Sequence, residues 1–286
     1  GVHRAVPAGP DRSLAALMRS RRALRDLDLD AAVLLPRSAR AAIAPWLARV
    51  PVRLGWGRRR SLTHEIAGWR PLRRAHRSTW YSAMAAAFGV RVGAPWLLEP
   101  PGEALAAADR LLLVLGHRAG RRLVVLEPGA SYGPAKCWPA ESFGALAARL
   151  HALGDVTVAT VGLRDARARE RVVDAHSGGQ ILRTAGKTPD LMTLVGLLAR
   201  ADLVVSNDTG PMHLAAAVGT PVLALFGGTD PAVSGPLGQG PRRLIHDPEP
   251  CGPCFLRVCP IANHPCLSKI GVERVHREAL RMLAEA

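Results

Sequence analysis

The chain has 286 residues, of which 48% are hydrophobic, enough to bury the core of one large domain or of two smaller ones. No apolar run approaches the roughly 18 residues of a membrane-spanning helix. The formal net charge of +15 first suggests a nucleic-acid partner. Only 4% of the residues are aromatic, and neither an RNA-stacking motif nor a helix-turn-helix pattern is found, so we exclude that class.

The positive charge is concentrated in the first part of the chain. Residues 1–110 contain 19 Arg and 8 acidic residues, a net charge of +11, whereas residues 111–286 contain 19 Lys or Arg and 15 acidic residues, a net charge of +4. A basic first part suits an anionic partner, such as a phosphorylated glycolipid or a membrane surface. Because only three basic residues are lysines and alanine is abundant, a compositional bias toward arginine is the alternative explanation.

Apolar periodicity in the first hundred residues predicts two short strands among helices. The expected helices cover Ser13–Leu27, Ala39–Ala48 and Thr79–Phe88, and the expected strands cover Ala31–Leu35 and Val52–Trp56. The basic stretch 57–77 contains Gly and Pro and is expected to be irregular, and residues 89–102 are expected to form a linker. Two strands are too few for a complete α/β domain.

From about residue 105 onward, strands and helices alternate regularly. The expected strands are Arg122–Glu127, Val156–Val161, Ile181–Leu182, Leu203–Ser206 and Val222–Phe226, and the expected helices are 139–153, 165–175, Pro189–Arg200, Pro211–Val218 and 272–284. Strands that are apolar throughout and alternate with helices form a parallel sheet covered on both faces. The sequence therefore predicts the α/β class, with a first domain over residues 1–104 and a complete doubly wound domain over residues 105–286.

The segment DLVVSNDTGPMHLAAAVGTPVLALFGGTDP, residues 202–231, predicts an anion site. In order, Asn207 and Asp208 end a strand, Thr209 and Gly210 form a turn, and Pro211 starts a helix. Free N–H groups at such a helix start bind anions, and Gly210 lets the backbone approach a ligand closely. His213 in the first turn adds a further contact. The alternative is an ordinary capped helix with a surface histidine.

A second loop, PGASYGPAKCWP over residues 128–139, follows the first strand of the regular region. It places the small residues Gly129, Ala130 and Ser131, together with Lys136, at a strand-to-helix junction. Backbone N–H groups and one lysine in this arrangement are typical of a phosphate cradle. The alternative is a flexible loop with a solvated lysine.

Four cysteines, Cys251, Cys254, Cys259 and Cys266, follow one another with the spacing C-x2-C-x4-C-x6-C, and Cys137 stands apart. Zinc sites favour two CxxC pairs, and this pattern has only one. Three alternatives remain open: a structural metal site, redox-active disulfides, or buried thiols in a compact loop. Whichever holds, we do not expect the cysteines to be catalytic.

Together, the PGASYGPAKCWP loop and the NDTGPMH turn resemble glycosyltransferase family 9, the family of the heptosyltransferases that build the inner core of lipopolysaccharide. The resemblance is strong over residues 122–232 and looser over residues 27–56. The PGA…GPAK…WP loop and the tail CGPCFLRVCPIANHPC are more similar to heptosyltransferase II than to heptosyltransferase I.

This resemblance implies a GT-B fold, in which two Rossmann-like, doubly wound domains face each other across a cleft. The C-terminal domain would hold ADP-heptose, and the N-terminal domain would hold an anionic, lipid-linked core oligosaccharide as acceptor. The reaction would be an inverting heptosyl transfer to the inner core of lipopolysaccharide, by a cytoplasmic protein in peripheral contact with the inner membrane. Neither a metal nor another cofactor would be required. The basic stretch Arg53–Arg77 would meet the acceptor, or is an ordinary solvated surface.

The resemblance also implies roles for individual residues. Lys136 and His213 would be catalytic, because they neutralise the departing ADP. The full set of expected donor-binding residues is Ser131, Lys136, Asp165, Asp208, Thr209, Gly210, His213, Thr229 and Asp230. Within this set, Asp208 would shape the turn, Asp165 would meet the ribose hydroxyls, and Thr229 and Asp230 would close the site.

One departure from the family concerns the general base. Family members begin with a strand and a turn containing Gly-Asp, whose aspartate is the expected base, and this sequence begins GVHRAVPAGPDRSLAAL without such a turn. The nearby acids Asp11, Asp26, Asp28 and Asp30 do not match the motif. We therefore expect an incomplete N-terminal domain and little sugar transfer. The alternatives are a family 9 transferase that uses another nucleotide sugar, and a catalytically inactive fragment that binds nucleotide sugars.

Overall fold

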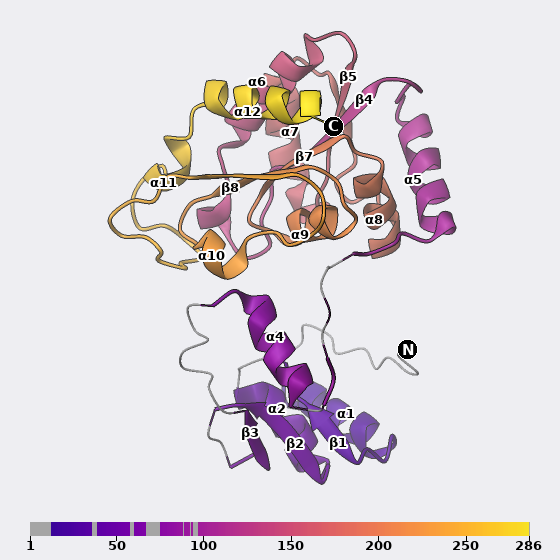
Figure 1. The fold of residues 1–286 in the computed structure, drawn as a ribbon, viewed down its shortest axis with the longest axis vertical. Coiled ribbons are helices and arrows are strands. Elements are labelled where there is room, and N and C mark those ends of the chain that lie inside the picture. Colours follow the sequence, from indigo (N-terminus) through magenta and orange to yellow (C-terminus); the bar gives the residue numbers. More distant parts are fainter. Residues whose placement is uncertain are drawn as a thin grey trace. The chain divides into compact units, whose positions relative to one another are not determined.

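The computed structural model describes residues 13–35, 39–57, 60–66, 75–87, 89–91, 93 and 97–285 of the chain. The chain divides into two compact units, Gly1–Gly93 and Ala94–Ala286 (Figure 1). The sequence predicted a boundary between residues 104 and 105, but this position lies inside helix α5, Gly102–Val114. This helix belongs to the second unit because it packs against α8, Leu191–Ala199.

The described part of the first unit contains a small parallel sheet with the strand order β1-β2-β3. The strands are β1 Ala31–Val33, β2 Val52–Trp56 and β3 His64–Ile66, and the helices are α1 Leu14–Arg25, α2 Ala39–Leu47 and α4 Arg77–Ala86. Strand β3 corrects the expectation that residues 57–77 are irregular. Three residues with only one buried side chain, Ile66, are too few to give a periodic signal.

The core of the first unit is small. Leu54, Trp56, Ile66 and Met84 form its buried cluster, against which Trp80 packs. Two apolar side chains of the Ala31–Leu35 segment stay exposed, Val33 at 45% and Leu35 at 53%, whereas Leu34 is buried. Within its described residues, the first unit therefore has a small core and two exposed apolar side chains at the end of β1, as we expect for a sheet with few strands.

The second unit contains a six-stranded parallel sheet with the order β6-β5-β4-β7-β8-β9. Its strands are β4 Arg122–Glu127, β5 Val156–Thr160, β6 Ile181–Arg183, β7 Leu203–Asn207, β8 Val222–Phe226 and β9 Arg242–His246. From the central strand β4 the chain first builds outward to β6 and then returns to build toward β9. This is the predicted doubly wound α/β arrangement, extended by one edge strand, β9, and by the helix α5 that the sequence did not predict.

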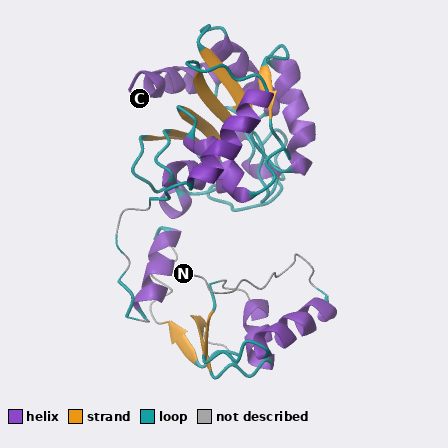
Figure 2. Ribbon diagram, turned by 90° about the vertical axis from the view of Figure 1, so that its right-hand side faces the viewer, coloured by secondary structure: helices purple, strands orange, loops and turns teal. Residues whose placement is uncertain are grey.

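Helices cover both faces of this sheet (Figures 1 and 2). The remaining helical segments are η1 Pro134–Lys136, α6 Ala140–His151, η2 Arg164–Ala166, α7 Arg167–His176, α9 Gly210–Ala217, α10 Pro231–Ser234, α11 Pro265–Ser268 and α12 Val272–Glu285. Val124 and Leu126 of β4 pack into a core with α6, α7 and α12, whereas Leu123 and Val125 pack into a core with α5, α8 and α9. The two cores explain why the strands are apolar along their whole length.

None of the helices in the described part of the chain is long and apolar enough to cross a membrane.

The packing of α5 against α8 depends on Gly196. A Cβ atom at this position would lie 2.2 Å from the carbonyl oxygen of Ala104. We predict that Gly196→Ala lowers the free energy of unfolding by about 1–3 kcal/mol, the usual cost of overpacking, in urea denaturation. Gly102→Ala in α5 is the control, because no atom lies within 4 Å of the added Cβ. Equal stability of the two variants would contradict this account of the helix pair.

Candidate functional site

Neighbouring strands β4 and β7 are joined at their carboxyl ends by one buried amide. Asn207, the last residue of β7, donates from Nδ2 to the carbonyl oxygens of Glu127 and Gly129, both at 3.1 Å. Its Oδ1 atom accepts the backbone N–H of Trp138 at 2.9 Å. The Asn207 side chain therefore holds both ends of the loop 128–139 against the end of β7.

A buried ion pair lies next to this amide. Lys136 Nζ lies 2.6 Å from Asp208 Oδ2, and the two side chains are only 15% and 5% exposed. The same ammonium group donates to the Asp208 carbonyl oxygen at 3.3 Å, and Ser234 Oγ donates to Asp208 Oδ2 at 3.3 Å. Loops from three adjacent strands, β4, β7 and β8, thus meet at the Asp208 carboxylate.

Helix α9 begins beside this ion pair with an open N-terminus. Thr209 precedes the helix in an extended conformation, and its side chain makes no capping hydrogen bond. Its hydroxyl lies 3.4 Å from the Ser206 hydroxyl instead. Gly210 is exposed, and a Cβ atom there would have no other atom within 4 Å. A helix start without a side-chain cap next to a lysine is suited to an anion, which favours the predicted anion site over an ordinary capped helix.

The other predicted residues lie on separate elements. His213 lies exposed in the first turn of α9, and Ser131 lies exposed in the loop after β4. Asp165 lies exposed in η2, which follows β5 on the other side of β4. All three follow the carboxyl ends of strands, where open α/β sheets bind ligands.

Two residues after β8 differ in their roles. The carboxylate of Asp230 accepts the backbone N–H of Ala232 at 2.9 Å and so caps the short helix α10. Thr229 is only 3% exposed, and its hydroxyl has no hydrogen-bond partner among the described residues. Asp230 therefore already has a structural task, whereas the Thr229 hydroxyl is a buried polar group without one.

Sequence reasoning missed Glu127, the last residue of β4. Its side chain is buried, and its Oε1 atom accepts the backbone N–H of Gly129 at 2.8 Å. The pKa of this carboxyl group is raised to about 8, because burial raises it strongly, the Gly129 hydrogen bond lowers it and the charge of Asp165 raises it. Glu127 is thus a neutral acid at pH 7. The sequence signal that could have indicated Glu127 is the acidic residue at the end of the apolar run RLVVLE.

The cysteine-rich loop packs against the predicted phosphate loop. The ring of Tyr132 lies between two cations, 5.1 Å from Lys136 Nζ and 5.0 Å from the guanidinium carbon of Arg257. Its hydroxyl donates to the carbonyl oxygen of Phe255 at 2.7 Å, and the Ala135 N–H donates to the carbonyl oxygen of Arg257 at 3.1 Å. Residues 251–266 therefore support the loop that contains Lys136.

The four clustered cysteines are free thiols. Cys251 is exposed and the other three are partly exposed, so the buried-thiol alternative is wrong. Partial burial raises the pKa of Cys266, and the charges of Cys259, Cys254 and Cys251 raise it further. Among the residues described, no three His, Cys, Asp or Glu side chains are arranged to hold a metal ion.

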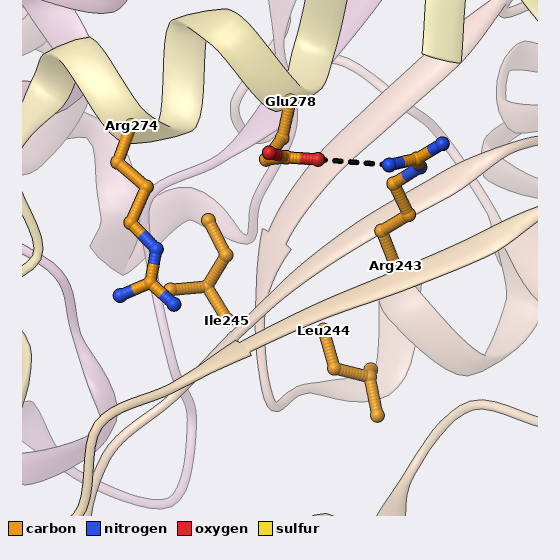
Figure 3. Close-up of a pocket in the computed structure, with 5 residues that line it drawn as sticks. All are labelled: Arg243, Leu244, Ile245, Arg274 and Glu278. Atoms are coloured by element: carbon orange, nitrogen blue, oxygen red, sulfur yellow. Dashed lines mark hydrogen bonds and ion pairs between the residues drawn. The ribbon is translucent and has the colours of Figure 1, made fainter. Parts of the chain in front are cut away.

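A hollow of about 320 Å³ lies elsewhere, between the edge strand β9 and helix α12 (Figure 3). Five residues line it, namely Arg243, Leu244, Ile245, Arg274 and Glu278. Arg243 pairs with Glu278 at 2.9 Å, and Arg274 pairs with Asp247. Because it lies beside the middle of a strand, away from the carboxyl ends of the strands, this hollow is not the predicted anion site.

Comparison with known proteins decides the family. The sequence pattern described as "Glycosyltransferase family 9 (heptosyltransferase)" matches residues 17–264. The chain belongs to glycosyltransferase family 9. Among curated relatives, Lipopolysaccharide heptosyltransferase 2 of Escherichia coli (strain K12) is 30% identical over 263 residues, which cover 85% of this chain and 71% of that protein. This confirms the resemblance to heptosyltransferase II.

Another relative is matched over a shorter region. Lipooligosaccharide heptosyltransferase 2 of Campylobacter jejuni subsp. jejuni serotype O:2 is 29% identical over 168 residues, 58% of this chain. The matched part spans about half of that relative, 52% of its length. The solved structure of E. coli ADP-heptose lps heptosyltransferase II superposes with a TM-score of 0.75 at 24% identity, covering 94% of this chain and 82% of that one. The predicted GT-B class of fold is thereby confirmed.

We predict that Asn207→Ala lowers the free energy of unfolding by about 2–4 kcal/mol, because two buried carbonyl groups and one N–H group lose their partner. Urea denaturation measures this change. Gln180→Ala removes an exposed amide of similar chemistry and should change stability by less than about 0.5 kcal/mol. If Asn207→Ala were as harmless as its control, the amide would not hold the loop 128–139 in place.

Proposed function

We propose that this family 9 chain binds ADP-heptose and acts in the inverting transfer of heptose to the inner core of lipopolysaccharide. The observation that carries the proposal is the junction at Asp208, where Lys136 and the open start of α9 lie together. The names of its relatives, which include ADP-heptose lps heptosyltransferase II, support the choice of donor.

The chemistry follows from the charges at this junction. Cleavage of the bond to the diphosphate gives an oxocarbenium-like transition state with negative charge growing on the leaving ADP. Groups aimed at developing charge usually make the largest catalytic contribution. Lys136, His213 and the N–H groups at Thr209 and Gly210 would stabilise that charge. With this positive charge supplied by the protein, we propose that ADP release needs neither a metal nor another cofactor.

The remaining predicted residues would define the rest of the donor site. Ser131 would donate a hydrogen bond to a phosphate, and Asp165 would accept from the ribose hydroxyls. The unpartnered hydroxyl of Thr229 would meet the donor from the end of β8. Asp230 would contribute through the position of α10, since its carboxylate is used as a cap.

The acceptor is proposed to be an anionic, lipid-linked core oligosaccharide at the cytoplasmic face of the inner membrane. The net charge of +11 in residues 1–110 supports contact with an anionic glycolipid and with the membrane surface. Transfer also needs a base that removes the acceptor hydroxyl proton. Because we assign that role to none of the acids in this sequence, donor binding is the property that tests the proposal first.

The sharpest test of the donor site is Gly210→Ala. The added methyl group has free space in the protein, so the variant should fold with unchanged thermal stability. It would, however, occupy the place proposed for the diphosphate, and we predict ADP affinity at least about tenfold weaker, equivalent to a cost of about 1.4 kcal/mol. Isothermal titration calorimetry with ADP measures this. Unchanged ADP affinity, or much tighter binding of UDP than of ADP by the wild type, would argue against an ADP-sugar site here.

Lys136→Ala tests the cationic contact. We predict a loss of about 1.5–3 kcal/mol in ADP binding, the range for charge-assisted hydrogen bonds. The variant also leaves the buried Asp208 carboxylate without its partner, so its melting temperature should fall and titrations must be made well below it. Lys187→Ala is the matched control, because this lysine is exposed. Equal ADP affinities of the two variants would show that Lys136 does not contact ADP.

The cysteine cluster gives a separate prediction. Sugar transfer needs no thiol, and the cysteines lie in a loop that supports the donor loop from outside. Cys254→Ser should therefore retain ADP affinity within about twofold, within roughly 0.4 kcal/mol. Calorimetry measures the affinity, and thermal melting reports on folding. Loss of ADP binding in a variant that melts like the wild type would show that the thiol takes part in the site.

A further inference from the structure

Glu127 lies beneath the proposed donor site in a setting that the chemistry described above does not use. It ends the central strand β4, is 4% exposed, and precedes the loop that contains Ser131 and Lys136. Its Oε1 atom accepts the N–H of Gly129 at 2.8 Å. Gly129 has no side chain, and a Cβ atom there would lie 2.8 Å from Oε1 and 3.6 Å from the Cβ of Ala166. The carboxyl group is therefore buried against Gly129 of the loop 128–139, and Gly129 in turn lies close to Ala166 of η2.

The surroundings of Glu127 favour its uncharged form. Its Oε2 atom is buried and has no hydrogen-bond partner in the part of the chain that the structure describes. A buried carboxylate with one hydrogen bond and no cation is strongly disfavoured relative to the acid. Lys136, the lysine of this loop, already pairs with Asp208. Asp165 of η2, the charged group that acts on Glu127 electrostatically, is itself an acid and offers no positive charge.

A neutral Glu127 suits the binding of a diphosphate, and a charged one opposes it. In the neutral state the carbonyl oxygen of the Glu127 side chain accepts and orients the Gly129 N–H. The side chain then carries no negative charge that would repel an incoming anion. Ionisation would place a negative charge in a water-excluded position directly below the loop proposed to hold the phosphates. Like charges in such surroundings repel strongly, because little solvent screens them.

We propose that Glu127 is a positioning residue of the donor site, which holds the phosphate loop through Gly129 and supports binding of a nucleoside diphosphate only in its neutral form. This inference rests on the proposed donor site. It adds a residue that acts through the loop, without direct contact with the donor. It also makes donor binding depend on pH, which a purely structural glutamate would not do.

The sign of the pH dependence follows from burial, which raises the pKa of Glu127 to about 8. Below that value the acid is neutral and donor binding is at its strongest. Above it the ionised form accumulates and affinity is lost. If only the neutral form binds, the affinity for ADP should be about tenfold weaker at pH 9 than at pH 7.

The test compares ADP titrations of the wild type and Glu127→Gln at pH 7, 8 and 9. Glutamine keeps the carbonyl acceptor for Gly129, is close in shape to the neutral acid and cannot ionise. We expect near-equal affinities at pH 7, a loss of about tenfold by pH 9 in the wild type, and a flatter profile in Glu127→Gln, which at pH 9 binds more tightly than the wild type. Parallel profiles of ADP affinity against pH in the two proteins would overturn the role of Glu127 but not the donor site. Absence of ADP binding at every pH would overturn the donor site, and this inference with it.

A second measurement does not depend on the variant folding. At pH 8 about half of the free wild-type protein should have an ionised Glu127, so ADP binding should take up about half a proton. Titrations in buffers with different ionisation enthalpies measure this uptake directly. Uptake near this value supports the proposal, and its absence in a wild type that binds ADP would contradict it.

Discussion

The Asn207 side chain is the constraint on which the proposed site depends. A single buried amide joins the end of β7 to both ends of the loop 128–139, through two carbonyl groups and one N–H group. Because the loop is held in this way, Lys136 reaches the carboxylate of Asp208, and α9 begins beside the pair. The parallel sheet supplies the framework, since its adjacent strands β4, β7 and β8 bring three loops to one edge.

The charges at this edge of the sheet suit the binding of an anion. The cation of Lys136 is balanced by Asp208 in the structure, and the uncapped start of α9 adds the partial positive charge of its free N–H groups. An incoming diphosphate would compete with Asp208 for the lysine, while Ser234 continues to donate to the carboxylate. A neutral Glu127 below the same loop fits this balance, because a charge there would cancel part of the attraction.

The sequence predicted the second unit well where strands are buried on both faces. The bounds expected for β4 and β8 are those observed, since unbroken apolar runs between turn residues leave little ambiguity. Helix α5 and strand β9 were missed, because α5 follows a segment rich in Gly and Pro and β9 is an edge strand whose residues are half polar. At the site, motif and resemblance predicted Lys136 and Asp208. The burial of Glu127 depends on tertiary packing that no local pattern encodes. Its hydrogen bond to Gly129 and the capping by Asp230 are local, each spanning two residues, and the Asp-Pro pair at the start of α10 was an available signal.

The most direct measurement is a crystal structure of this chain with ADP. The account predicts the diphosphate at the start of α9, with phosphate oxygens against the N–H groups beside Gly210 and with Lys136 Nζ turned from Asp208 toward a phosphate. The adenosine should lie toward η2 and Asp165. ADP bound in the hollow between β9 and α12, or at the strand ends without contact to Lys136 and α9, would contradict it.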